Sequence, residues 1–396
     1  AGKLLTGAAL LLALAWSLLL GSWHLEGRRS FLDPIEDLAL DLRFLVAGER
    51  PPPDGLIIVA IDDRTIQEVG TYPLPRKVVA RLVEEIAKQE PTVVALDLLF
   101  IESKPEGDPA LHAALAAMPT VIGGVALFTP EGDSLSDPLS GGAPGPLALL
   151  PRARELLLPT EALRGAAEIG LVNVSTDASG TPRHIPLLFR TGQGNALAPS
   201  FALVGAALAA QASPKIGEDS LTLGERVIPL DLGFHLPIGF YGPRGSIPTI
   251  SASHVLLGEL PPGELRGRVV VVGATAIASG DTFATPFSPV VPGVEILATA
   301  IGNLIAGEGL IRTPDLRWAD ALVAGLLAIL AVLLIDLRRT SLGLLSALLL
   351  GGAWVAFAFV LFSYRYWFSI ALPLATMLPV AVFYGTARLW LDRRHM

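Results

Sequence analysis

The chain contains no cysteine, so disulfide bonds and thiolate chemistry are excluded from its fold and its function. It is also short of basic residues: 29 Lys and Arg stand against 37 Asp and Glu, for a formal net charge of −8. That balance offers no overall positive charge for binding nucleic acid. Only 17% of the residues are charged and 52% are hydrophobic, which is typical of a chain that lies partly in a membrane.

Motifs of the common enzyme classes are missing as well. The six histidines are scattered, with no H-E-x-x-H spacing, and no G-x-S-x-G elbow surrounds Ser253-His254. The run after Gly273 is neither a P-loop nor a G-x-G-x-x-G fingerprint. The sequence therefore gives little support for a zinc site, a serine-hydrolase active site or a phosphate-binding loop.

Four long apolar segments are present, at 4–23, 318–335, 341–362 and 368–387. About 20 apolar residues of helix cross a hydrocarbon core of roughly 30 Å. The segments therefore predict four transmembrane helices, one before a polar middle and three after it. Asp320 lies inside the second segment, and we expect its side chain to reach the membrane interface.

The tryptophans and arginines predict how these helices cross. All six tryptophans lie in or beside the apolar segments, which predicts an aromatic belt with Trp367 at one interface. Arg338, Arg339 and the basic tail favour both termini in the cytoplasm and the polar middle outside. We expect segment 4–23 to be an uncleaved anchor, since no clear cleavage site follows; a signal peptide is the alternative.

The polar middle alternates between apolar runs and periodic segments. After a stalk helix near 33–45, buried strands are predicted at 56–61, 91–100, 120–128 and 268–273, with helices near 75–89, 108–117, 197–210, 250–258 and 292–307. This pattern predicts a layered α/β domain with a largely parallel or mixed sheet. A hairpin is expected between 170–174 and 184–190, and 129–165 reads as an exposed loop.

Candidate site residues follow the predicted strands. Ligands of parallel sheets bind beyond the carboxyl ends of the strands. Here those ends carry Asp62, Asp63, Asp97, Thr275 and Asp281. Such a set could hold a divalent cation, a polyol or an amine. The alternative for each residue is a structural role, as a helix cap or as a hydrogen-bond acceptor in a tight turn.

Arg183 is a further candidate for contact with a ligand. It follows the turn 177–180 in the middle of the polar region. The membrane segments carry little chemistry of their own. Ala347, Gly351 and Gly352 are small enough to permit close contact between helices, which favours association of two copies.

Six stretches stand in one order along the chain: Asp41-LRF, Ile58-VAIDDRTIQEVGTYPLPR, Ala95-LDLLF, Gly170-LVNVSTDASGTPR, Gly267-RVVVVGATAIASGDTFATP and Pro292-GVEILATAIGNLI. Together they resemble the second class of the CHASE family, whose name abbreviates "cyclases/histidine kinases associated sensory extracellular". The resemblance covers most of 40–305. One departure is Tyr72, where the family commonly has tryptophan.

The resemblance implies an extracytoplasmic input domain, one crossing before it and three after it. A cytoplasmic adenylate or guanylate cyclase, histidine kinase or serine/threonine kinase usually follows in this family. No effector follows Arg388-LWLDRRHM here, so we expect an input without its output, either as a fragment or with a separate partner. Cyclase and histidine-kinase outputs generally work as dimers, which predicts a homodimer.

The sequence therefore predicts a bacterial inner-membrane receptor that is no enzyme itself and binds a small extracellular ligand and membrane lipid. Its regions are 1–23 (first crossing), 24–317 (extracytoplasmic sensor), 318–390 (three crossings) and 391–396 (start of a cytoplasmic tail). No cofactor is expected unless a divalent cation binds the acidic strand ends. Two alternatives are a structural envelope protein and a membrane-anchored metal-dependent hydrolase that uses Asp62, Asp63, Asp97 and Asp281.

Overall fold

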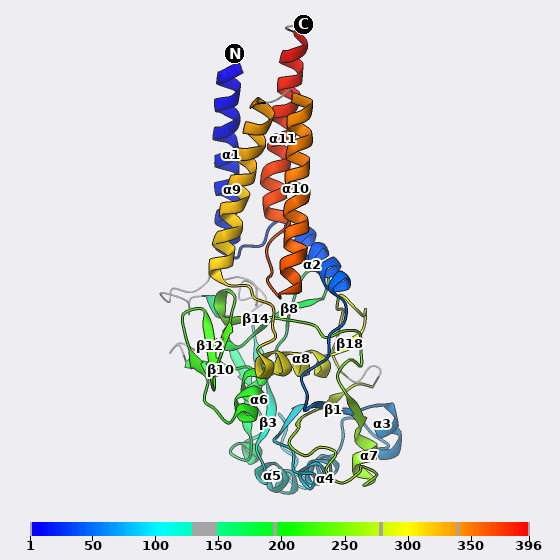
Figure 1. Cartoon of the computed structure of the whole chain (residues 1–396). Helices are drawn as coiled ribbons and strands as arrows, with labels where there is room; N and C mark the ends of the chain where they lie inside the picture. The colour runs from blue at the N-terminus through cyan, green and yellow to red at the C-terminus, as the bar shows by residue number, and fades with distance from the viewer. Residues whose placement is uncertain (1, 129–148, 193–195, 277–279, 338–339, 395–396) are drawn as a thin grey trace. The chain divides into compact units, whose positions relative to one another are not determined.

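The computed structural model describes residues 2–128, 149–192, 196–276, 280–337 and 340–394. The chain divides into two compact units (Figure 1). Residues 48–310 form the α/β unit, and residues up to 47 together with those from 311 onward form the helical unit. Residues 24–47 and 311–317, which the sequence assigns to the sensor, pack with the apolar helices. The predicted boundaries at 23 and 318 concern the membrane surface and stay predictions.

A seven-stranded sheet forms the centre of the α/β unit. The strand order is β15-β1-β16-β2-β3-β5, and β6 also pairs with β3. All pairs are parallel except β3 with β5, so the predicted layered domain with a largely parallel or mixed sheet is confirmed. The strands are β1 (Leu56–Ile61), β2 (Val93–Leu99), β3 (Thr120–Leu127), β5 (Glu155–Leu157), β6 (Glu168–Leu171), β15 (Thr249–Ser251) and β16 (Val269–Ala274).

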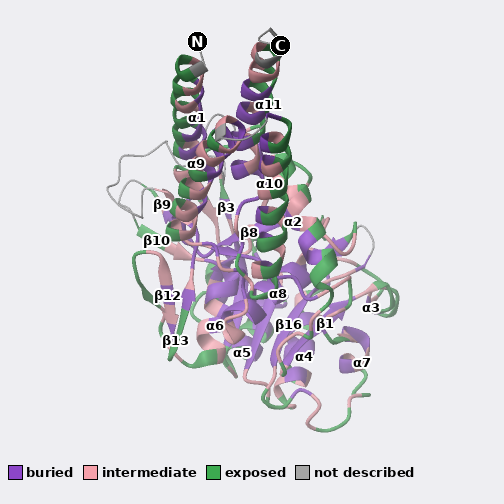
Figure 2. Cartoon of the chain, turned by 45° about the horizontal axis from the view of Figure 1, so that its top comes forward, coloured by how far each residue is buried: buried purple, intermediate pink, exposed green. Residues whose placement is uncertain are grey.

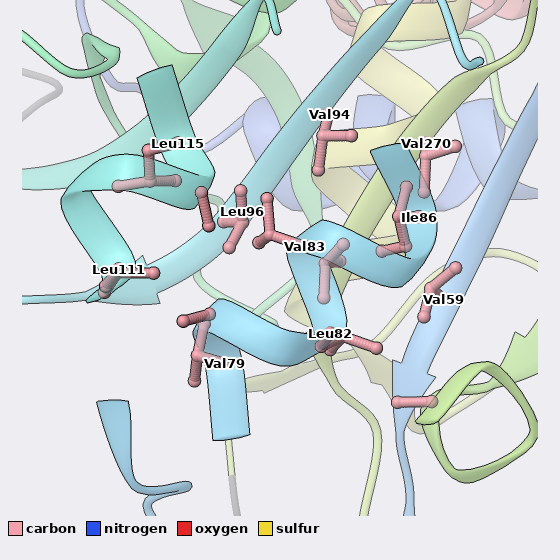
Figure 3. Packing of buried hydrophobic residues seen from close by; sticks show 14 of the residues in the cluster. Val59, Val79, Leu82, Val83, Ile86, Val94, Leu96, Leu111, Leu115 and Val270 are labelled. Carbon is pink, nitrogen blue, oxygen red and sulfur yellow. The ribbon is translucent and has the colours of Figure 1, made fainter. Parts of the chain in front are cut away.

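Both faces of this sheet are buried, which explains why its strands read as continuous apolar runs. Alternate residues such as Val59 and Val270 point toward one layer of helices, where Leu82 and Ile86 meet them (Figure 3). In Figure 2 the central strands are accordingly buried. The layer on this face consists of α4 (Arg76–Ala87), α5 (Asp108–Ala116) and α7 (Ala252–Leu256); α6 (Phe201–Ala210) and α8 (Gly293–Ala306) cover the other face.

Smaller elements complete the α/β unit. The helices are α3 (Asp63–Val69) and the 3-10 turns η2 (Glu161–Leu163) and η3 (Leu232–Phe234). The remaining strands form the small sheets β10-β9-β4, β11-β12-β13, β14-β8-β7 and β17-β18. Their bounds are β4 (Arg152–Ala153), β7 (Ser175–Thr176), β8 (Pro182–Pro186), β9 (Leu188–Thr191), β10 (Ala196–Pro199), β11 (Lys215–Ile216), β12 (Ser220–Leu223), β13 (Arg226–Pro229), β14 (His235–Pro237), β17 (Thr282–Phe283) and β18 (Val291–Pro292).

Two local predictions are wrong. The expected hairpin of 170–174 with 184–190 does not form, because β6 pairs in parallel with β3 and only β7 pairs with β8 across the turn. The expected helix at 250–258 is shorter, because residues 249–251 extend the large sheet as β15 beside β1. Of the predicted loop 129–165, residues 129–148 lie outside the described residues, and 152–153 and 155–157 are strands β4 and β5.

The helical unit contains four helices long and apolar enough to cross a membrane, as predicted. They are α1 (Gly2–Leu25), α9 (Pro314–Leu337), α10 (Thr340–Ser363) and α11 (Ala371–Arg394), and α2 (Asp33–Ala47) packs against α10 and α11. Ala347 and Gly351 are buried within this bundle, where a Cβ on Gly351 would lie 2.7 Å from Met377 Cε. Gly352 faces outward with open space before it.

Two side chains expected at the membrane interface are buried within the helical unit. Asp320 does not reach outward: its side chain is 0% exposed. Trp367 is also buried, and its indole Nε1 donates to Glu36 Oε1 at 2.9 Å. Trp318 and Trp390 are exposed, as an aromatic belt requires. The connection at Arg338 and Arg339 and the end of the predicted tail, 395–396, lie outside the described residues.

Candidate functional site

The carboxyl ends of β1, β2 and β16 open into a cavity of about 650 Å³. The first turns of α4 and α8, the segment 172–176 and strand β17 form the rest of its lining. The described lining residues all belong to the α/β unit. The cavity therefore lies where parallel sheets commonly bind ligands.

Asp97 places a carboxylate in this cavity. In β2 it stands opposite Gly273 of β16, and a Cβ on that glycine would lie 2.6 Å from Val294 Cγ2. Glycine at 273 thus lets α8 pack closely over the strand ends. Among the described residues, none donates a hydrogen bond to the Asp97 carboxylate. Burial, together with the charge of Asp281, raises the pKa of Asp97 to about 7.

Asp281 is the second carboxylate in the lining. It immediately precedes β17, and its side chain is exposed. Its backbone carbonyl accepts a hydrogen bond from Gly293 N–H at 2.8 Å, which ties the segment to the start of α8. Of the residues expected at the strand ends, Asp97 and Asp281 both line the cavity, and the charge of Asp281 acts on Asp97.

Asp62 and Asp63 do not line the cavity. Asp62 caps α3, where its Oδ1 accepts from Thr65 N–H at 2.9 Å and from Ser251 Oγ at 2.9 Å. Partial burial alone would raise the pKa of Asp62, but hydrogen bonds from Thr65 and Ser251 outweigh it and lower the pKa. Asp63 lies in the first turn of the same helix, where the helix dipole stabilises a negative charge.

Thr275 and Arg183 also lie elsewhere. Thr275 closes the end of β16, with its N–H bonded to Ile61 O and its carbonyl accepting from Arg244. Arg183 lies in β8, in another sheet, and its Nε donates to Asp177 Oδ2 at 2.8 Å. Of the predicted residues, the structure therefore brings only Asp97 and Asp281 into the cavity.

Sequence reasoning missed two further residues of the cavity lining, Arg76 and Tyr72. Arg76 lines it with its guanidinium 4.4 Å from the centre of the Phe100 ring, and its Nε donates to Asp108 Oδ1 at 3.2 Å. Tyr72 stands nearby, and burial and the Asp97 charge raise the pKa of its phenol. Tyr72 and Arg76 bound the stretch Tyr72-PLPR that carries part of the family resemblance, and that was the available signal.

The structure also brings His184 and His235 together, with ring centres 6.3 Å apart, which their spacing in the sequence concealed. His184 Nε2 lies 3.1 Å from Asp231 Oδ2. Burial, and secondarily His184, lower the pKa of His235 to about 4. Within the described residues, no group of three or more His, Asp or Glu side chains is placed to hold a metal ion.

A buried ionic network lies within the helical unit. Glu36 of α2 accepts from Arg43 Nη2 at 2.5 Å, and the Arg43 side chain is 0% exposed. The second carboxylate oxygen of Glu36 accepts from the backbone N–H groups of Ile370 and Ala371, at 2.8 and 2.9 Å. Since these N–H groups stand at the start of α11, Glu36 caps a helix more than 330 residues away in the chain.

A second ion pair continues the network. Arg312 Nη1 donates to Asp320 Oδ2 at 2.5 Å and to the Trp367 carbonyl at 2.6 Å. Asp320 Oδ1 accepts from Ser369 N–H at 3.0 Å, and His24 Nε2 lies 3.2 Å from Asp320 Oδ2. The segment 367–371, which leads into α11, is thus bonded to two other parts of the chain. Glu36 of α2 accepts from its N–H groups, and Arg312, just before α9, donates to its Trp367 carbonyl.

Comparison with known proteins returned one family. The sequence matches the CHASE2 domain over residues 9–337, which is most of the chain and includes the cavity, most of α1 and all of α9. No curated protein and no solved structure matches it.

Proposed function

This chain belongs to the CHASE2 family, and on that premise we propose that it is the sensory input and transmembrane relay of a bacterial signalling receptor. CHASE2 is an extracellular sensory domain of signalling receptors and is not itself catalytic. In our proposal the chain controls a cytoplasmic nucleotide cyclase or protein kinase, in the same polypeptide or in a partner, and works as a homodimer in the inner membrane.

The observation that carries the relay is the buried ionic network. The α/β unit is joined to the helical unit by two chain segments, which leave it at 48 and at 310. The first leads directly into α2 and Glu36, and the second into Arg312. Because both are bonded to segment 367–371, a displacement of either one acts on the N-terminus of α11. Small helix shifts of about 1–2 Å are a common form of such signals.

The cavity at Asp97 is the proposed sensory site. A ligand there shifts the receptor only if its affinity differs between two states of the protein. The metal-dependent hydrolase is not favoured, because Asp62 is occupied as a helix cap and the four acidic candidates do not line one cavity.

In the proposed topology the α/β unit is extracytoplasmic and both termini are cytoplasmic. The chain has no cysteine, so single introduced cysteines report their side of the membrane without background. We expect Tyr364→Cys, at an exposed site between α10 and α11, to react with an impermeant maleimide in intact spheroplasts. Ser341→Cys, at the opposite end of α10, should react only after permeabilisation. The reverse pattern would contradict the topology.

The relay is tested by a distance between α1 and α11, measured away from the N-terminus of α11 that Glu36 caps. Spin labels on Leu4→Cys and Phe383→Cys, both exposed, report the separation of α1 and α11 in nanodiscs. We expect Glu36→Gln to shift or broaden the distance distribution, because the cap on α11 is weakened. Glu26→Gln is the control, since its pair with Arg28 is about half exposed on both sides.

An unchanged distribution in Glu36→Gln would argue against a relay through the network. The same labels test the homodimer: a chain labelled only at Leu4 shows a dipolar distance only if two copies associate. A purely monomeric signal in membranes would remove the dimer from the proposal.

A further inference from the structure

The cavity has the size of a small-molecule site. Its volume of about 650 Å³ lies within the roughly 300–1,000 Å³ of ligand pockets. Much of the wall is apolar, with Leu99, Phe100 and Val294 among its residues. An ion with its hydration shell would leave most of this wall uncovered, whereas an organic ligand with an apolar body would cover it.

The charge of the lining is negative. Asp97 and Asp281 contribute two carboxylates. Arg76 is the basic residue among the described residues of the lining, and it is bonded to Asp108, a carboxylate that is 1% exposed and outside the cavity. Its charge is therefore already balanced. The two cavity carboxylates have no such cationic partner among the described side chains, so a cation is the ligand that would neutralise them.

We infer that the cavity binds a small organic ligand carrying a protonated amine on an apolar body, with the amine at Asp97. The inference rests on the proposed sensory function and names the ligand class for that site. Asp97 lies at the strand end beneath the start of α8, and the apolar body lies along Phe100 and Leu99.

Two other ligand classes fit less well. A bare Ca²⁺ takes six to eight oxygen ligands, and the lining offers two carboxylates. An anion would be attracted by the first turn of α8, but Gly293 N–H there is already bonded to Asp281 O, and both carboxylates would repel it. Phosphate and Ca²⁺ therefore serve as the competing probes.

The raised pKa of Asp97 adds a second signature. An amine binds the ionised carboxylate, and Asp97 is largely protonated below pH 7. Asp281, Tyr72 and Arg76 face the same cavity, and of these Asp281 is the charge that raises the Asp97 pKa. We therefore expect amine affinity to fall by about tenfold or more between pH 8 and pH 5.5.

The test uses the full chain in nanodiscs and measures binding by calorimetry. The probes are pentylamine, cyclohexylamine and 2-phenylethylamine, each beside the alcohol of the same skeleton. We expect at least one amine to bind about tenfold or more tightly than its alcohol, the factor of a charge-assisted hydrogen bond. Asp97→Asn should remove that difference. Asp54→Asn, which changes an exposed carboxylate outside the cavity, should keep it.

The inference is overturned if no amine exceeds its alcohol, if Asp97→Asn keeps the preference, or if phosphate or Ca²⁺ binds the cavity in place of the amines. Binding is measured on the chain without any output. A failure here therefore leaves the relay through Glu36 untouched, and a failure of the spin-label test leaves the ligand class untouched.

Discussion

Replacing Glu36 with alanine is expected to destabilise the helical unit by about 3–5 kcal/mol, the usual cost of removing one partner from a buried ion pair. The cost is high because Arg43 would stay buried without its carboxylate. The substitution also removes the acceptor for Ile370 N–H and Ala371 N–H, so two N–H groups at the start of α11 lose their hydrogen bonds. Burial alone would raise the pKa of Glu36, but Arg43 and these hydrogen bonds outweigh it and hold the pKa below its usual value.

Tryptophan fluorescence measures this effect selectively. All six tryptophans lie in the helical unit, and the α/β unit has none, so emission during denaturant titration follows the unfolding of the helical unit alone. Glu26→Ala is the control, because the Glu26–Arg28 pair is about half exposed and such pairs contribute about 0–1 kcal/mol. Equal losses in the two variants would mean that the Glu36 network contributes little to stability.

The pH dependence of the Glu36 contribution to stability follows from the direction in which folding shifts its pKa. Its folded pKa is lowered, so the stabilisation is present above the usual pKa of 4.5 and is lost as pH falls through the lower folded pKa. The double variant Glu36→Ala with Arg43→Met differs from Glu36→Ala only in the Arg43 charge, because methionine keeps an unbranched side chain at 43. If it recovers much of the stability lost by Glu36→Ala, the loss came from the stranded Arg43 charge.

Much of the fold follows from apolar patterns in the sequence. The four membrane helices and strands β1, β2, β3 and β16 are long, continuous apolar runs, and hydrophobic burial selects them whatever their neighbours are. Strand β15 was missed because its three residues carry no period and are held in the sheet only by β1. Residues 170–174 were paired with the wrong strand, since only the tertiary fold brings β6 beside β3.

The candidate site was predicted in part. Strand ends indicated Asp97 and Asp281, because parallel strands share one carboxyl edge. Asp62 stands at an equivalent strand end, and the choice between a cap and a site depends on Thr65 and Ser251, which face it only in the folded chain. The contacts of Glu36 with Ser369 and Ile370 were not predictable, since these partners lie more than 330 residues away in the sequence.

Asp97→Asn is expected to stabilise the α/β unit at pH 8, by about 2–4 kcal/mol, although it removes the proposed ligand contact. Burial and the Asp281 charge raise the folded pKa of Asp97 to about 7, from a usual value of 3.8. The folded protein thus holds this proton more tightly than the unfolded chain, and stability falls as pH rises from about 4 to 7. Asparagine has the same shape without the charge, so its advantage should be below about 1 kcal/mol at pH 4.

Amide hydrogen exchange at β1, β2 and β16 measures this change, because opening of the sheet exposes those amides. Variant and parent are compared at the same pH, so intrinsic exchange rates cancel. The control Asp54→Asn should alter protection by no more than about 0.5 kcal/mol at either pH. A variant that is equally stable or less stable at pH 8 would show that the ionised Asp97 carboxylate does not destabilise the fold. Stabilisation confined to high pH would show that the cavity holds an ionised carboxylate at a cost to folding, as ligand sites often do.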